Sequence, residues 1–214
     1  MIKVVSWNVG KMYQPLEELL AMNDTDVALL QEVGAGMRDH LSAAGGPIAT
    51  SPHDPWEPAP KSDYDRWPLV VKLSDRVEIE WFRQVRATIP REDNDEIAVS
   101  CGGTIAAAKV NPLEGGEPFI AVSMYARWFT PHPTTGSRYI YSDAAAHHII
   151  SDGNVATFYT SGNSPATAEN QLDYVFASRG FHNSVRTRAV NGVDEWGSSD
   201  HCRILIEVGD RTAS

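Results

Sequence analysis

The stretch that decides the fold is MIKVVSWNV, residues 1–9, together with the two segments that follow it. It clusters apolar and β-branched residues and stops at Gly10, which predicts a buried β-strand. Residues 15–22 (PLEELLAM) begin with proline and repeat apolar residues at helical spacing, so we expect a short helix. Residues 26–32 (DVALLQE) form a second compact apolar run. Strand, helix and strand in this order are typical of a layered α/β fold.

The rest of the chain adds many strands and few helices. A stretch rich in proline and glycine at 45–68 predicts a long loop, and Trp56 and Trp67 within it indicate that this loop packs on the body of the protein. A capped helix is expected over 142–150. Further strands are expected at 69–73, 77–84, 103–110, 118–125, 171–177, 185–189 and 202–208. This pattern favours two packed β-sheets with helices outside, in a single domain over 1–214 without repeats.

Composition limits the class of protein. With 42% hydrophobic and 21% charged residues the chain has an ordinary globular composition. No apolar window approaches the ~18 to 20 residues of a membrane span, and the first residues show no secretory leader, so we expect a cytoplasmic location and no membrane partner. The two cysteines, Cys101 and Cys202, match no zinc or redox spacing. We expect two reduced, largely buried thiols, with a disulfide as the alternative.

The net charge bears on the substrate. A formal charge of −10 argues against a protein that holds long duplex DNA through many phosphate contacts, because such binding needs a basic face. It allows a nuclease with a small phosphate footprint, in which local basic residues and a divalent cation neutralise the substrate.

Polar side chains lie at the ends of the expected strands. They occur in five motifs, which are SWNV (6–9), LQEV (30–33), SMY (123–125), QLDYVF (171–176) and SDH (199–201). If neighbouring strands bring these ends to one rim, the side chains that meet there are Asn8, Glu32, Tyr125, Asp173, Asp200 and His201. Hard oxygen ligands for Mg²⁺ or Mn²⁺ and an imidazole with a carboxylate partner are what phosphodiester hydrolysis requires.

In this order, SWNV, LQEV, a strand that ends in tyrosine, LDYVFAS and SDH resemble the motifs of the endonuclease/exonuclease/phosphatase superfamily. The resemblance spans residues 4–208 and rests on the order of the motifs, since any one of them occurs often by chance. It implies a four-layer α/β/β/α sandwich of two mainly antiparallel sheets flanked by helices. It also implies a hydrolase that uses Mg²⁺ or Mn²⁺ to cleave phosphodiesters, with nucleic acid as the expected substrate.

The resemblance implies a role for each matching residue. Glu32 would be the principal metal ligand, Asn8 would sit beside the metal and the phosphate, and Asp200 would complete the acidic cluster. The ordinary alternatives are a solvated strand end for Glu32 and a turn residue for Asn8.

Three further roles concern the phosphate. The resemblance implies that Asp173 accepts a hydrogen bond from His201 and orients it, and that His201 contacts the scissile phosphate or assists the attacking water. Tyr125 would hydrogen-bond the phosphate. Taken alone, these residues are a surface carboxylate, a structural histidine and a packed aromatic.

Other aromatic, basic and imidazole side chains have weaker claims. The tryptophans are interpreted mainly as packing residues, and these are Trp7, Trp128 and Trp196. Arg127 and His132 follow the Tyr125 strand end and are candidates for the leaving-group side. His147 and His148, on the expected Ala-rich helix, are interpreted as structural or solvated.

The chain also departs from the family pattern. The Gly-Asp-x-Asn motif expected between the Tyr125 strand and LDYVFAS is absent, and only Asp152 and Asn154 have its spacing. We hypothesise that roughly 40 to 60 family-typical residues are missing near 152–153; a continuous, well-formed connection there would make these two residues candidates instead. Gly10 stands where some of these nucleases carry an acidic residue, which weakens the case for a second metal. The residues after Tyr125 differ from the Pro-Asn of apurinic-site enzymes, which puts that specificity in doubt.

The first functional hypothesis is therefore a divalent-metal-dependent phosphodiester hydrolase, a nuclease acting on nucleic acid. A phosphoesterase for small molecules or lipid headgroups is the alternative within the same class, and the acidic charge keeps this alternative open. A catalytically impaired binding protein of the same fold is the alternative from another class. The sequence sets no oligomeric state.

Overall fold

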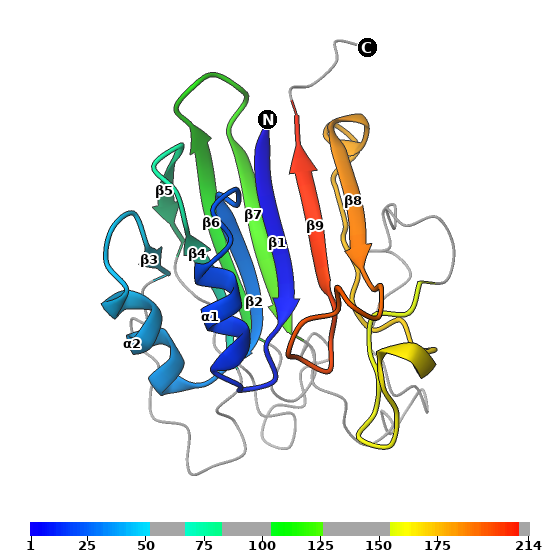
Figure 1. Ribbon diagram of the computed structural model, residues 1–214. Helices are drawn as coiled ribbons and strands as arrows, with labels where there is room; N and C mark the ends of the chain where they lie inside the picture. Colours follow the sequence, from blue (N-terminus) through cyan, green and yellow to red (C-terminus); the bar gives the residue numbers. More distant parts are fainter. Residues whose placement is uncertain (52–66, 83–103, 126–154, 210–214) are drawn as a thin grey trace, which may run out of the picture.

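The computed structural model describes residues 1–51, 67–82, 104–125 and 155–209, and it contains two β-sheets (Figure 1). The first sheet has six strands in the order β3-β4-β2-β1-β9-β8. Their bounds are β1 Ile2–Asn8, β2 Val27–Val33, β3 Ala49–Thr50, β4 Trp67–Lys72, β8 Val185–Val190 and β9 Arg203–Val208. The second sheet has three strands, which are β5 Val77–Trp81, β6 Thr104–Pro112 and β7 Phe119–Tyr125.

The strands pair mainly in antiparallel fashion. Only β1 and β2 run parallel in the described ladders, and helix α1 (Gln14–Leu20) connects them, as a parallel crossover requires. Helix α2 (Ala35–Ala43) follows β2. The parallel pairing places the carboxyl ends of β1 and β2 side by side, with Asn8 opposite Gln31.

Two apolar layers hold this arrangement together. The layer between the two sheets combines side chains of the first sheet with those of the second, for example Val4 and Val70 with Val77 and Val110. The layer on the other face of the first sheet packs β1, β2 and β4 against both helices, with Trp7, Leu16 and Leu41 among its members. Figure 1 shows α1 and α2 lying over that face. The chain is thus an α/β sandwich of two mainly antiparallel sheets, which confirms the predicted fold class.

Most predicted helices and strands are confirmed, with small differences at their ends. The confirmed elements are β1, α1, β2, β4, β5, β6, β7, β8 and β9. The stretch predicted as a loop at 45–68 contains the short strand β3 and the first residue of β4, Trp67, which is buried. Helix α2 was not predicted.

The prediction of a strand at 171–177 is wrong. This segment carries a single bridge residue, Phe176, and enters neither sheet. Its side chains alternate between exposed and half-buried, which imitates a strand, but its backbone has no ladder among the described residues.

Several sequence predictions lie outside the described residues. They concern the loop residue Trp56, Cys101, Arg127, Trp128, His132, the helix at 142–150 with His147 and His148, and the segment Asp152, Gly153 and Asn154. Within the described part of the chain, no helix is long and apolar enough to cross a membrane.

Candidate active site

The side chains of Asn8, Glu32 and Tyr125 meet at one rim of the sandwich. Asn8 ends β1, Glu32 lies near the end of the neighbouring strand β2, and Tyr125 ends β7 in the second sheet. The Asn8 amide Nδ2 donates to Glu32 Oε1 at 3.3 Å, and the Tyr125 hydroxyl donates to the same oxygen at 2.9 Å. The Glu32 carboxylate therefore links the two sheets at this rim.

The backbone of Glu32 is unusual. Its φ is +54°, in the left-handed region that non-glycine residues rarely adopt. The ladder between β2 and β4 shifts register between Leu30 and Val33, so the strand bulges around this residue. Lys11 has a φ of +58°, and its N–H donates to the Glu32 carbonyl at 3.0 Å, which anchors the irregular backbone.

A buried polar network lies next to Glu32. Gln31 is 8% exposed, and its Nε2 donates to Ser123 Oγ at 2.9 Å. The Ser123 hydroxyl in turn donates to the carbonyl of Leu30 at 2.8 Å. Gln31 belongs to the first sheet and Ser123 to the second, so this network fixes the distance between the sheets beside the Tyr125–Glu32 contact.

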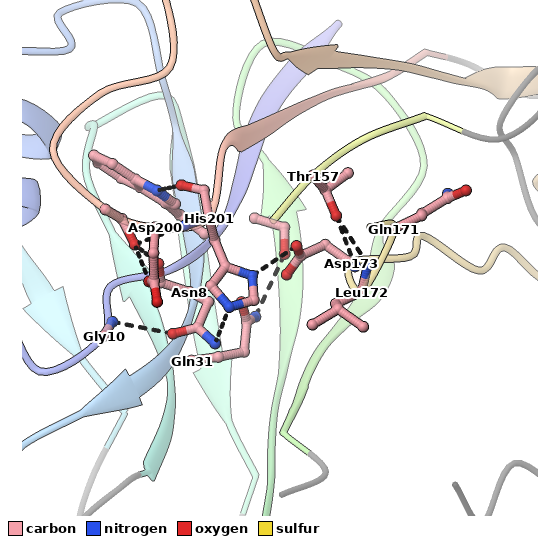
Figure 2. Close-up of polar contacts among 12 residues, drawn as sticks. Asn8, Gly10, Gln31, Thr157, Gln171, Leu172, Asp173, Asp200 and His201 are labelled. Atoms are coloured by element: carbon pink, nitrogen blue, oxygen red, sulfur yellow. Dashed lines mark hydrogen bonds and ion pairs between the residues drawn. The ribbon is translucent and has the colours of Figure 1, made fainter. Parts of the chain in front are cut away.

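A histidine–aspartate pair lies against Asn8 (Figure 2). His201 Nδ1 and Asp173 Oδ2 are 2.8 Å apart, with the side chains only 10% and 16% exposed. Because an ionised carboxylate can only accept, Nδ1 carries the proton and Nε2 is the basic nitrogen of the neutral ring. Nε2 faces Asn8 Nδ2 at 3.3 Å. The contacts thus run without a break from Tyr125 to Asp173.

The surroundings raise the pKa of His201. Burial acts to lower the pKa of this imidazole, and it is the largest single influence. The hydrogen bond and charge of Asp173, with the charges of Asp200 and Glu32, together outweigh burial and favour the imidazolium. A ring with a raised pKa beside carboxylates is suited to holding a proton or an anionic phosphate oxygen.

Ser199 organises the loop that carries Asp200 and His201. Its hydroxyl donates to the backbone carbonyl of Asn8 at 2.6 Å and lies 3.3 Å from Asp200 Oδ1, while it accepts the N–H of His201 at 3.2 Å. Trp7 Nε1 donates to the carbonyl of His201 at 2.9 Å, so this buried tryptophan supports the site as well as the core. Trp196 is also buried, so both Trp7 and Trp196 are packing residues, as predicted.

Gly10 stands where an acidic residue is found in some nucleases, and its surroundings explain the difference. Its φ is +55°, and a Cβ there would lie 3.4 Å from Asp200 Oδ1 and 3.2 Å from Met12 Cε. Any side chain at this position would be close to Met12 Cε, and the positive φ would strain a residue that has a Cβ. The local geometry therefore favours glycine.

The donor chemistry of the rim fits a hard divalent cation. Among the described residues, no group of three or more His, Cys, Asp or Glu side chains is arranged to hold a metal. The half-buried Glu32 carboxylate and the carboxylate of Asp200 offer oxygen atoms, whereas Asn8 turns its Nδ2 toward Glu32 and its Oδ1 accepts the N–H of Gly10 at 3.0 Å. Mg²⁺ is commonly held by one or two carboxylates while it keeps several waters, so a full protein cage is not needed.

The structure brings all six sequence-predicted site residues to this rim, although Asp200 is linked to the others through Ser199. Sequence reasoning missed Gln31 and Ser123, which pin the sheets, and Thr157, whose hydroxyl accepts the backbone N–H of Asp173 at 3.1 Å. Gln31 and Ser123 lie inside the quoted motifs, so their position was a usable signal. Thr157 belongs to no motif.

No protein-family model and no curated protein matches the sequence. Several solved structures are similar to it in fold. An endonuclease/exonuclease/phosphatase family protein from Bacteroides thetaiotaomicron has a TM-score of 0.63 at 12% identity, over 99% of this chain and 98% of that chain. The endonuclease/exonuclease/phosphatase from Bacteroides vulgatus has a TM-score of 0.60 at 14% identity, over 97% of this chain and 98% of that chain.

A third similar structure is D. rerio TDP2 complexed with single strand DNA product, with a TM-score of 0.52 at 11% identity over 96% of this chain and 97% of that chain. A humanized form of TDP2 aligns over only 49% of that chain and 57% of this one, at 17% identity and a TM-score of 0.40. The near-complete alignments show that this chain has the fold of the endonuclease/exonuclease/phosphatase superfamily. The resemblance found in the ordered motifs is thereby confirmed for the fold.

Proposed function

We propose that this protein is a divalent-metal-dependent phosphodiester hydrolase that acts on nucleic acid. The observation that carries the proposal is the continuous contact from the Asp173–His201 pair, at 2.8 Å, through Asn8 to Glu32 and Tyr125. A polarised imidazole next to a half-buried carboxylate, on a fold shared with nucleases and phosphatases, suits attack of water on a phosphodiester.

In this proposal Glu32 would be the principal metal ligand, and Asn8 and Asp200 would lie beside the metal. Mg²⁺ or Mn²⁺ at this position would polarise a phosphoryl oxygen and offset the negative charge that develops on the phosphate. The contact from Tyr125 to Glu32 Oε1 and the contact from Asn8 hold the carboxylate in one orientation before the cation arrives.

His201 handles the proton of the attacking water. The water oxygen forms a bond to phosphorus opposite the leaving oxygen, the ester P–O bond breaks, and the proton lost by the water passes to Nε2. Asp173 stabilises the imidazolium through Nδ1 at 2.8 Å, and solvent protonates the leaving oxygen. In this scheme the raised pKa of His201 also lets its protonated form bind the phosphate of the product.

Two observations bear on the substrate. TDP2 of similar fold was captured with a single strand DNA product, which supports nucleic acid as the class of substrate here. The net charge of −10 supports a short phosphate footprint, and it also favours the second candidate, a small-molecule or lipid-headgroup phosphoesterase.

Hydrolysis of bis(p-nitrophenyl) phosphate with Mg²⁺ or Mn²⁺ tests the reaction class. We expect Glu32→Ala and His201→Ala to lose activity by about 10²-fold or more. Glu80→Ala and His182→Ala are the matched controls, since both residues are exposed and lie outside the site, and they should keep full activity. Activity that persists in both site variants would refute the mechanism.

Substrate comparison follows with the active protein. Single-stranded and duplex oligonucleotides, RNA and phosphocholine esters at equal phosphate concentration should show a preference for the oligonucleotides. A preference for the small esters would favour the second candidate. Binding of oligonucleotides without turnover in every metal would point instead to a catalytically impaired binding protein.

A further inference from the structure

Asp173 is held firmly although its segment belongs to no sheet. Residues 171–177 have no ladder in the described structure, yet Asp173 Oδ2 lies 2.8 Å from His201 Nδ1, and its side chain is 16% exposed. A carboxylate on an unsupported segment would sample many positions, and the pairing with His201 would be lost for part of the time. Some other element must therefore position it.

Thr157 makes direct contact with the backbone of this segment. Its side chain is buried, at 1% exposure, and its hydroxyl oxygen accepts the N–H of Leu172 at 3.0 Å and the N–H of Asp173 at 3.1 Å. Figure 2 shows both bonds next to the Asp173–His201 pair. One buried oxygen thus fixes two consecutive peptide units, the second of which carries the carboxylate.

The backbone around Thr157 ties the Asp173 segment to the His201 segment. Four main-chain hydrogen bonds do this, namely Thr157 N to Asn170 O at 2.8 Å, Phe158 N to Asn170 O at 3.0 Å, Tyr159 N to Asp200 O at 3.1 Å and Cys202 N to Thr157 O at 2.9 Å. Residues 157–159 therefore lie between two segments that are 28 residues apart at the Asp173–His201 pair.

The ring of Phe158 completes the support from the side of the imidazole. Its centroid lies 4.7 Å from that of His201, with the two planes tilted by 43°. Phe158 also forms isolated bridges to both Asn170 and His201. The same short segment therefore restrains the backbone of Asp173 and the ring of His201.

We propose that Thr157 is a positioning residue for the Asp173–His201 pair. It touches neither substrate nor metal, and it acts by holding the peptide of Asp173 so that the carboxylate stays on Nδ1. We call the two hydrogen bonds from the N–H groups of Leu172 and Asp173 to the Thr157 hydroxyl the clamp. The role of Thr157 in positioning the pair rests on the proposed hydrolase function, but the clamp is a property of the fold that can be measured separately. Valine at this position would keep the shape of the side chain and remove the hydroxyl oxygen that accepts both N–H groups.

The kinetic test compares Thr157→Val with Thr157→Ser. A displacement of the acting groups by about 1 Å costs roughly 10²-fold in rate, so we expect kcat of the valine variant to fall about 10- to 100-fold while KM stays unchanged. Serine keeps the acceptor and should restore kcat. Thr25→Val is the control for loss of a buried threonine hydroxyl far from the pair, and it should keep kcat. Equal losses in Thr157→Val and Thr25→Val would overturn the proposal.

A double-variant test asks whether Thr157 acts through Asp173. Asp173→Asn removes the charge that Thr157 is proposed to place, so adding Thr157→Val should cause no further fall in kcat. Multiplied losses in the double variant would show that Thr157 acts on something else, and would overturn the proposal.

Hydrogen exchange separates the clamp from the function. In Thr157→Val the amides of Leu172 and Asp173 should exchange at least about tenfold faster, while strand amides of β1 keep their protection; serine should restore protection. Unchanged exchange in the valine variant would refute the clamp whatever the activity. If the wild-type protein hydrolyses no phosphodiester but the exchange pattern is as expected, the proposed function fails and the clamp stands. If the valine variant does not fold, Thr157→Ser decides the matter, since loss of protection there would contradict an oxygen-based clamp.

Discussion

Replacement of Glu32 by glycine should separate the stability of the fold from the chemistry of the site. Glu32 has a φ of +54°, and a left-handed residue with a Cβ costs about 1–2 kcal/mol. Alanine keeps the Cβ and the cost, whereas glycine adopts this backbone freely. Both replacements remove the carboxylate, so the loss of its contacts with Asn8 and Tyr125 cancels when the two variants are compared.

The expected difference follows from two opposing quantities. Glycine recovers about 1–2 kcal/mol of backbone strain, and the greater freedom of the unfolded chain offsets about 0.5–1 kcal/mol of this. Glu32→Gly should therefore be more stable than Glu32→Ala by about 0.7 kcal/mol. In a protein of this size that difference corresponds to a rise in Tm of about 2 °C.

Urea unfolding of both variants measures the difference, provided that their m values agree. Leu29 supplies the internal control, because it lies in the regular part of the same strand, paired with Ser6 and Val70. There the order should reverse, with Leu29→Gly less stable than Leu29→Ala by about 0.5–1 kcal/mol. The sign of the stability difference between the glycine and alanine variants at each position is a firmer test than its magnitude.

The reasoning is refuted if the glycine variant is less stable than the alanine variant at position 32 as well as at position 29. Both Glu32 variants should also lack hydrolase activity, because neither has a carboxylate. A Glu32→Gly protein that is more stable than Glu32→Ala and inactive would show that the strained backbone serves the site and not the fold.

Four further measurements test other parts of the molecule. Burial raises the pKa of the Cys202 thiol to about 12, so in a Cys101→Ser background iodoacetamide should label it only after unfolding; rapid labelling of the folded protein would contradict this. The thiol loses its proton at lower pH in the unfolded chain than in the folded protein, so the free energy of unfolding should fall as pH rises from about 9 towards 12. In Cys202→Ala, which has no thiol at this position, the fall should be smaller. Ser123→Ala removes one acceptor of Gln31 Nε2, which still has Leu29 O at 3.0 Å, and the hydroxyl that donates to Leu30 O, so it should lower the free energy of unfolding by about 1 kcal/mol in denaturant; an unchanged midpoint would show that the network is dispensable. Chelation with EDTA should abolish hydrolysis without altering circular dichroism, and Mg²⁺ should restore it; activity that survives chelation would remove the cation from the mechanism.

The strands were predictable because their apolar patterns match the layers that they bury. Residues 1–9 and 26–32 are rich in valine, leucine and isoleucine because β1 and β2 are covered on one face by helices and on the other by the second sheet. Helix α2 escaped prediction because Gly34 precedes it and Gly36 lies in its first turn, and because, among its described side chains, only Met37 and Leu41 are buried apolar ones. That stripe is too short to produce a clear helical period.

The site was predictable only as far as strand ends define it. Asn8, Glu32 and Tyr125 could be placed together because they end strands that a sandwich brings to one rim. Asp173 lies 2.8 Å from His201, but the strand predicted around it does not form, since the alternation of 171–177 carries no information about a pairing partner. Thr157 could not be found at all, because its importance comes from the backbone of Asp173, which is 16 residues away.

The position of Glu32 shows why a strand pattern cannot reveal such a site. Successive side chains of a regular strand point to opposite faces, so Gln31 and Glu32 should not both reach the second sheet. They do, since Gln31 bonds Ser123 and Glu32 accepts from Tyr125, and these two partners lie two residues apart on the same face of β7. The left-handed residue and the register shift rotate the Glu32 side chain back toward β7. The buried hydrogen bond between Gln31 and Ser123 lies one residue before Glu32 in β2, and it holds the two sheets together beside the strained backbone of Glu32. The geometry of the candidate site therefore depends on a local break in the rule that makes the strand recognisable.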